Sequence, residues 1–440
     1  MVYNIVLGRR EKDVKKYGIR GTAYLGRQYV QMGAVTSLSN PVYLDMNTTH
    51  VVFISGKRGS GKSYTMGVIA EGMADMDEEA RKRLSIILLD TMGVYWTMKF
   101  PNHQDAELLK DWNMEPKALN IKIFTPVGYF KKAKEQGVPT DVAFSIKPSE
   151  LDPEDWFVSF DISAGDPVGV FLERLILTLK ESGKDYSIQD IITTIQADEH
   201  EDEHVKNTAV NRFIAADKWG VFSTEGTPLA DLAVPGQVTV LDMSAYAILP
   251  EGWKIKCLVL GLVSKRLFVE RMIQRKAEEF QSIHSAMHYF EEEKEEEEGR
   301  PLVWLVIDEA HEFLPLEGKT AASDSLISLL REGRQPGVSL ILATQQPGKI
   351  HTDVMTQSDI FISHRLTAKL DVDALEAITP TYLRKGIGYQ FDILPRVKGS
   401  ALALDDVNER VYPMKIRPRF TWHGGSAPTV LKEKKKIFEF

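Results

Sequence analysis

The feature that most constrains the fold is a glycine-rich loop between a strand pattern and a helix pattern. Residues 50–55 read HVVFIS, a short apolar and β-branched run, and residues 56–63 read GKRGSGKS. An amphipathic stretch follows and reaches about Met73. Strand, loop with the spacing GxxxxGK[ST], and helix in this order let backbone N–H groups surround phosphate oxygens. The sequence therefore predicts a phosphate-binding loop in an α/β fold.

Each residue type in this loop suits a nucleoside triphosphate. Glycine permits the backbone conformations that curl N–H groups around phosphates, and the helix N-terminus adds partial positive charge. The Lys62 ammonium can reach the β- and γ-phosphates, and the Ser63 hydroxyl can bind Mg²⁺. We therefore expect ATP and Mg²⁺ as ligands, with nucleotide contacts from Gly56, Arg58, Gly59, Ser60, Gly61, Lys62, Ser63 and Tyr64.

A second apolar run, LVWLVI at residues 302–307, ends in the acidic pair Asp308 and Glu309. A carboxylate at the end of a buried strand beside a phosphate loop can hold magnesium through water, which is the role we expect for Asp308 together with Ser63. Glu309 is the candidate general base that would polarise the attacking water.

A third apolar run, LILAT at residues 340–344, is followed by Gln345. Its amide can sense the γ-phosphate and orient the water; the alternative is a surface loop. Arg331 and Arg334 precede this run and are candidates for an arginine finger that reaches a neighbouring subunit, with Arg334 preferred. Alternatively, they are cations that complement the end of a helix dipole.

The composition sets wider limits. The 440 residues are 43% hydrophobic and 26% charged, with a formal net charge of −8, which is typical of a globular protein of two or three domains. The only cysteine, Cys257, excludes an intramolecular disulfide and fits a cytoplasmic location. No apolar run approaches the length of a membrane span. The acidic balance argues against binding nucleic acid by bulk charge, but a local basic channel stays possible.

Taken together, these motifs resemble the HerA branch of the HerA/FtsK superfamily. The resemblance rests on GKRGSGKS, on IDEAHEFL at 307–314 and on RxGRxxGVSLxLATQQP at 331–347, and a segment at 394–419 resembles the closing strands of the family. It implies a RecA-like ATPase core with a mostly parallel sheet. It also implies a homohexameric ring, ATP-driven translocation or helicase activity on double-stranded DNA, and work at DNA ends beside a NurA-type nuclease.

The domain organisation follows from the positions of these motifs. We expect a short β-rich segment at 1–46, core segments at 47–100 and 236–420, a helical insertion at 101–235, and a tail at 421–440. The family often carries an N-terminal barrel of about a hundred residues. Here residues 20–46 predict only a reduced barrel or an edge hairpin.

Several further residues have a structural and a functional interpretation. Asp90 follows the strand pattern SIILLD and is expected to be a structural or subunit-contact carboxylate, and a core helix is expected over 255–272. His364 and Arg365 are placed at a subunit interface. His200 and His204 suggest a metal site by composition, although a solvated charge run is the preferred interpretation.

DNA contact is assigned to Lys131, Lys132 and Lys134, with a solvated loop as the alternative. An acidic run at 291–298 is expected to be solvent-exposed, and the basic tail at 432–440 to touch DNA or a neighbour, or to fray. Two other functions stay open: a secretion or conjugation motor ATPase, and a nucleotide-dependent assembly scaffold. The water-activating Glu309 argues against the scaffold.

Overall fold

The computed structural model describes residues 3–32, 35–287, 301–377 and 386–425; the predicted acidic run at 291–298 and the basic tail at 432–440 lie outside these ranges. One 13-stranded sheet runs through the molecule in the order β1-β3-β2-β13-β12-β11-β4-β10-β9-β5-β8-β6-β7. Its strands are β1 (Ile5–Leu7), β2 (Thr22–Met32), β3 (Val35–Asp45), β4 (Val51–Ser55), β5 (Leu84–Asp90), β6 (Ile121–Pro126), β7 (Val142–Phe144), β8 (Val238–Asp242), β9 (Leu302–Ile307), β10 (Val338–Thr344), β11 (Ile360–His364), β12 (Ser400–Asp405) and β13 (Arg410–Ile416).

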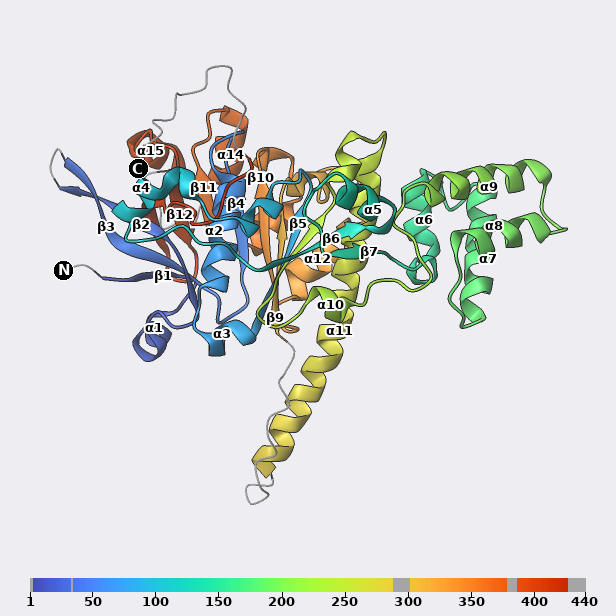
Figure 1. Ribbon diagram of the computed structural model, residues 1–440, viewed down its shortest axis with the longest axis horizontal. Helices are drawn as coiled ribbons and strands as arrows, with labels where there is room; N and C mark the ends of the chain where they lie inside the picture. Colours follow the sequence, from blue (N-terminus) through green and yellow to red (C-terminus); the bar gives the residue numbers. More distant parts are fainter. Residues whose placement is uncertain (1–2, 33–34, 288–300, 378–385, 426–440) are drawn as a thin grey trace.

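Helices pack on both faces of this sheet (Figure 1). In chain order they are α1 (Glu11–Tyr17), α2 (Lys62–Ala74), α3 (Glu78–Lys82), α4 (Ala106–Asp111), α5 (Val127–Glu135), α6 (Pro153–Phe160), α7 (Pro167–Glu181), α8 (Ile188–Ala197), α9 (Glu203–Asp217), α10 (Leu229–Leu232), α11 (Gly252–Met287), α12 (Ser323–Glu332), α13 (Thr352–Gln357), α14 (Lys369–Ala377) and α15 (Ile387–Ile393).

The centre of the sheet is parallel, from β11 through β4, β10, β9, β5, β8 and β6 to β7. Every residue of β5, β8, β10 and β11 is buried, because helices cover both faces. This explains why these strands read as continuous apolar runs. It also brings the polar residues at their carboxyl ends to one edge of the sheet.

The N-terminal β segment extends this sheet as an antiparallel hairpin. β2 pairs with β3 and is joined to the core through β13, where Met414 lies opposite Gln28. Residues 20–46 thus form a hairpin near one end of the sheet, and β1 pairs with β3 as the outermost strand. Gly26 permits this junction, because a β-carbon there would lie 2.0 Å from the carbonyl oxygen of Lys415.

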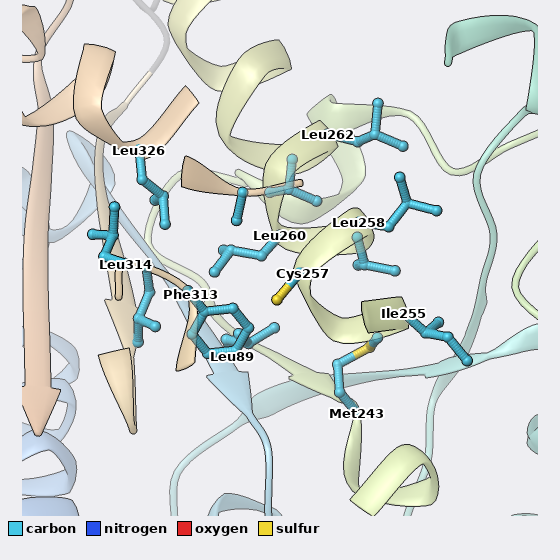
Figure 2. Close-up of a cluster of buried hydrophobic side chains, with 14 of the residues drawn as sticks. Leu89, Met243, Ile255, Cys257, Leu258, Leu260, Leu262, Phe313, Leu314 and Leu326 are labelled. Atoms are coloured by element: carbon cyan, nitrogen blue, oxygen red, sulfur yellow. The ribbon is translucent and has the colours of Figure 1, made fainter. Parts of the chain in front are cut away.

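Two hydrophobic cores fill the two faces of the sheet. One lies under α2 and the hairpin, and the other lies under α11, α12 and the helices at one end of the molecule. Figure 2 shows part of the second core, where Cys257 of α11 lies among leucines and faces Phe313. Burial raises the pKa of the Cys257 thiol to about 12. The core helix predicted over 255–272 is present as part of α11. This helix continues to Met287 and projects from the body of the molecule (Figure 1).

The segment predicted as a helical insertion is only partly helical. β6 and β7 fall within residues 101–235 and join the parallel sheet beside β8. Helices α6 to α9 form a separate lobe at the end of the sheet (Figure 1). Trp156 of α6 anchors this lobe, with its ring 4.9 Å from that of Phe213 on α9. Residues 101–235 thus combine helices with two strands of the main sheet.

Candidate nucleotide site

The predicted phosphate loop connects β4 to α2. β4 ends at Ser55, and α2 begins at Lys62, the lysine of the motif. Gly56, Gly59 and Gly61 have positive φ angles of 155°, 74° and 120°, which is the conformational freedom that the loop requires of glycine. A β-carbon on Gly56 would lie 2.4 Å from Oγ of Ser60. Only glycine fits at this turn.

The acidic motif meets this loop across one intervening strand. β10 lies between β4 and β9, and β9 ends immediately before Asp308. The Ser63 hydroxyl donates a hydrogen bond of 2.6 Å to Oδ2 of Asp308, although 245 positions separate the two residues. Lys62 and Asp308 are both only 7% exposed. Burial raises the pKa of Asp308, because its hydrogen bonds and the charge of Lys62 only partly offset the cost of removing the carboxylate from water.

Glu309 occupies an unusual position beside this pair. Its φ of 51° and ψ of 44° are left-handed, which is strained for a residue with a β-carbon. Burial, followed by the charge of Asp308, raises the pKa of Glu309 to about 7. Within the described part of the chain, its buried Oε2 has no hydrogen-bond partner. A buried acceptor of this kind is available to a water molecule.

Gln345 comes directly after β10, between the loop and the acidic motif. Its backbone N–H contacts the Glu309 carboxylate. The neighbouring Thr344 hydroxyl lies 3.0 Å from Nδ1 of His311. The structure therefore brings Lys62, Ser63, Asp308, Glu309 and Gln345 to one edge of the sheet.

The two candidate arginines lie at the opposite edge. Arg331 is in the last turn of α12, and its Nε donates to Oδ2 of Asp353 at 2.7 Å. Arg334 is exposed, and its carbonyl oxygen lies 3.5 Å from the hydroxyl of Thr49, which precedes β4. Arg334 precedes β10, so the length of this strand, roughly 20 Å at 3.3 Å per residue, separates it from Gln345. Neither arginine reaches the phosphate loop of its own chain.

His364 supports the phosphate loop from within, and sequence reasoning missed this role. It ends β11 and is fully buried, so the prediction that it faces a subunit interface is wrong. Its Nε2 lies 2.9 Å from the Thr65 hydroxyl, and its Nδ1 lies 3.2 Å from the carbonyl oxygen of Ser400. Burial lowers the pKa of His364 to about 4, so the ring is neutral. The available signal in the sequence was its position at the carboxyl end of an apolar strand, close to the edge where Asp308 lies.

Asp90 shapes the loop that follows β5. Its carboxylate accepts hydrogen bonds from the backbone N–H groups of Gly93 at 2.7 Å, Val94 at 3.1 Å and Tyr95 at 2.8 Å. Burial, followed by the charge of Asp242, raises its pKa to about 6. These contacts are those of a structural carboxylate, one of the two roles expected for Asp90.

Two further candidate segments differ from their expected local structure. Lys131, Lys132 and Lys134 lie on helix α5 and not in a loop. Lys131 forms an i,i+4 pair with Glu135, and Lys134 packs over the Phe130 ring. His200 lies in the turn before α9, so it does not share a helix face with His204.

No metal cluster or membrane-spanning helix is found in the described ranges. No group of three or more His, Cys, Asp and Glu residues there is arranged to hold a metal ion. Arg174 instead pairs with Asp198 and Glu201 of the same charge run. No helix in these ranges combines the length and the apolar character needed to cross a bilayer.

Comparisons with known proteins identify a family for this chain. The sequence model described as "Helicase HerA, central domain" matches residues 30–252, half of the chain. The chain is 28% identical over 134 residues to the probable DNA double-strand break repair helicase HerA of Methanocaldococcus jannaschii, and 28% identical over 148 residues to that of Pyrococcus furiosus. These matches cover 28% and 32% of this chain, but only 25% and 26% of the relatives' lengths.

The fold is similar to that of a solved protein structure. VirB4 of Thermoanaerobacter pseudethanolicus aligns with a TM-score of 0.53 at 13% identity, covering 90% of this chain and 96% of that one. At this identity the likeness concerns the fold alone, a RecA-like α/β core. The match over residues 30–252 includes the phosphate loop described above. On this basis, the chain belongs to the family of the HerA helicase central domain.

Proposed function

We propose that this chain hydrolyses ATP and uses the energy to move along double-stranded DNA, as a HerA-type translocase or helicase acting at DNA ends. The observation that carries the proposal is the 2.6 Å hydrogen bond between Ser63 and Asp308, with Glu309 next to it. This contact joins a triphosphate-binding loop to a potential water-activating carboxylate. The DNA substrate is proposed from family membership and from the names of the two helicase relatives.

Each residue at this edge of the sheet would have its own role in ATP hydrolysis. Backbone N–H groups of the loop and the Lys62 ammonium would hold the β- and γ-phosphates. Glu309 would accept a proton from the attacking water, and Gln345, which touches Glu309 through its backbone, would position that water. The buried Ser60 hydroxyl, which has no partner among the described residues, is a further donor for a phosphate oxygen.

The Ser63 and Asp308 side chains fit a magnesium ion. They offer a hydroxyl and a carboxylate oxygen 2.6 Å apart, and oxygen ligands are the kind that Mg²⁺ prefers. When bound there, Mg²⁺ would neutralise negative charge on the triphosphate.

In this proposal, two neighbouring copies of the chain together form one complete hydrolysis site. Arg331 and Arg334 lie far from the loop of their own subunit, so an arginine could act only on a neighbour's nucleotide. A head-to-tail homohexameric ring in the cytoplasm, working with a NurA-type nuclease, completes the proposal.

Steady-state ATP hydrolysis with and without linear duplex DNA tests this function. We expect DNA to raise the turnover of the wild-type chain. Glu309→Gln should still bind ATP but lose about 10²-fold or more in turnover, since its general base is gone. Glu317→Gln, an exposed carboxylate in the same loop, is the matched control and should behave as wild type. Hydrolysis that no DNA stimulates would contradict the DNA motor and favour the secretion ATPase or the assembly scaffold.

A further inference from the structure

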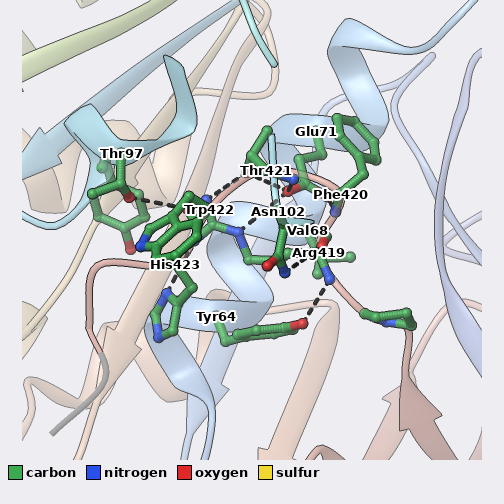
Figure 3. Close-up of polar contacts among 12 residues, drawn as sticks. Tyr64, Val68, Glu71, Thr97, Asn102, Arg419, Phe420, Thr421, Trp422 and His423 are labelled. Atoms are coloured by element: carbon green, nitrogen blue, oxygen red, sulfur yellow. Dashed lines mark hydrogen bonds and ion pairs between the residues drawn. The ribbon is translucent and has the colours of Figure 1, made fainter. Parts of the chain in front are cut away.

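A C-terminal segment crosses helix α2 beside the phosphate loop. We call residues 417–425 the C-terminal strap; Figure 3 shows most of its contacts with α2. Its anchor is Glu71, fully buried in α2, which accepts hydrogen bonds from Arg417 Nη1 at 2.7 Å, Arg419 Nε at 3.2 Å and the Thr421 backbone N–H at 3.0 Å. A β-carbon on Gly67 would lie 2.7 Å from the Arg419 guanidinium. The strap is therefore seated closely on this helix.

The strap brings aromatic side chains to the first turn of α2. Tyr64 follows the proposed magnesium ligand Ser63, and its hydroxyl accepts a 2.6 Å hydrogen bond from the backbone N–H of Arg419. The rings of Tyr64 and His423 meet edge to face, with centroids 5.1 Å apart and an angle of 77° (Figure 3). Trp422, the neighbour of His423, is 36% exposed. These rings lie at the same end of α2 as the phosphate loop.

The contact between His423 and Arg419 shows which ring nitrogen of the histidine carries the proton. Arg419 Nη1 lies 3.2 Å from His423 Nδ1, and a guanidinium can only donate. Nδ1 is therefore the acceptor, and the neutral ring carries its proton on Nε2. Burial, followed by the charge of Arg419, lowers the pKa of His423 to about 4, in agreement with a neutral ring. Within the described residues, the Nε2–H group has no hydrogen-bond partner.

We propose that Tyr64, Trp422 and His423 form the subsite that binds the base of the nucleotide, and that this base is a purine. The proposal rests on the proposed function, because it assumes a triphosphate in the loop at 56–63. A triphosphate held there leaves its ribose and base to extend past the first turn of α2, where Tyr64 lies.

The chemistry of these side chains fits a purine. Aromatic rings bind bases by stacking, and the larger bicyclic base gains more contact than a pyrimidine does. The His423 Nε2–H would donate to a purine ring nitrogen. One donor of this kind suits both adenine and guanine, which share N3 and N7 as acceptors. We therefore expect discrimination between purines and pyrimidines, but little between ATP and GTP.

Calorimetric binding of ATP, GTP, CTP and inorganic tripolyphosphate to the full chain tests this subsite. Wild type should bind ATP and GTP roughly five- to tenfold more tightly than CTP. His423→Ala and Trp422→Leu should each weaken ATP binding by a similar factor and leave tripolyphosphate binding within about twofold. His423→Gln, which keeps an N–H donor, should recover part of the loss.

The comparison separates failure of the subsite from failure of the proposed function. His200→Ala, an exposed histidine in the helical lobe, is the matched control and should bind all four ligands as wild type does. ATP binding unchanged in both strap variants, or CTP bound as tightly as ATP, would overturn the subsite while nucleotide binding stands. Wild type that binds neither ATP nor tripolyphosphate would overturn the proposed function. If His423→Ala fails to fold, ATP binding by Trp422→Leu tests the subsite instead, because Trp422 is exposed.

Discussion

At the residue scale, two buried histidines at opposite ends of the parallel strands differ in charge because their partners differ. His364, beside the phosphate loop, meets a hydroxyl and a carbonyl oxygen, and burial lowers its pKa to about 4. His50 precedes β4 at the other end, with Nδ1 2.7 Å from Asp359 Oδ2 and Nε2 3.3 Å from Asp45 Oδ2. Burial alone would lower the pKa of His50, but these carboxylates outweigh it and raise the pKa to about 9.

This raised pKa predicts a pH-dependent stability. A histidine whose pKa is higher in the folded chain stabilises it fully below the unfolded pKa of 6.5, and the contribution is lost as the pH rises through about 9. The free energy of unfolding should thus fall by up to about 3 kcal/mol from this group between about pH 6.5 and 9.5. Urea unfolding at both pH values measures it.

Two histidine variants test this prediction, one that removes His50 and one that serves as a control. His50→Gln should remove most of the fall in stability with pH. His103→Gln, at an exposed histidine, should keep it. An equal pH slope in His50→Gln and wild type would show that the Asp45–His50–Asp359 cluster does not hold a charged imidazole.

At the element scale, the strap and α2 are held together by a buried charge cluster. Removing the carboxylate with Glu71→Ala leaves the buried Arg417 and Arg419 without their counter-ion. Loss of one partner from such a cluster costs roughly 3–5 kcal/mol of unfolding free energy. Glu79→Ala breaks an exposed pair with Arg20 and should cost less than about 1 kcal/mol. Similar losses in the two variants, measured by urea unfolding, would be evidence against the strap as a structural clamp.

The elements also differ in how far the sequence could predict them. The strands of the core could be predicted because a sheet covered on both faces requires continuous apolar runs, as in LVWLVI before Asp308. The helix at Lys131 could not, since flanking glycines suggested a loop and its charged face carries no strong apolar pattern. The cluster at Glu71 joins residues up to 350 positions apart. No local pattern marks such a contact.

At the scale of the whole molecule, the predicted site residues divide between two edges of the sheet. The sequence places Lys62, Asp308 and Gln345 together, because the carboxyl ends of parallel strands meet. It cannot assign the arginines, since a residue that acts on a neighbouring subunit need not approach its own loop.

Complementation between two inactive variants tests this arrangement. Arg334→Ala should reduce ATP turnover by about 10³-fold or more, and Lys62→Ala should abolish nucleotide binding. When the two are co-expressed in one ring, an intact loop can face an intact Arg334, so roughly a quarter of the interfaces should be active in a random mixture. A mixture no more active than its separate components would contradict Arg334 as the arginine supplied by a neighbour, and the same experiment with Arg331→Ala would then test the other candidate.

Displacement of a third DNA strand from a linear duplex tests the central claim most directly. We expect the wild-type chain to displace the strand when ATP is hydrolysed, but not with a non-hydrolysable analogue. Glu309→Gln should bind ATP and fail to displace it. Rapid ATP hydrolysis by the wild-type chain with no displacement of the strand, on any duplex end, would contradict a motor that moves on DNA.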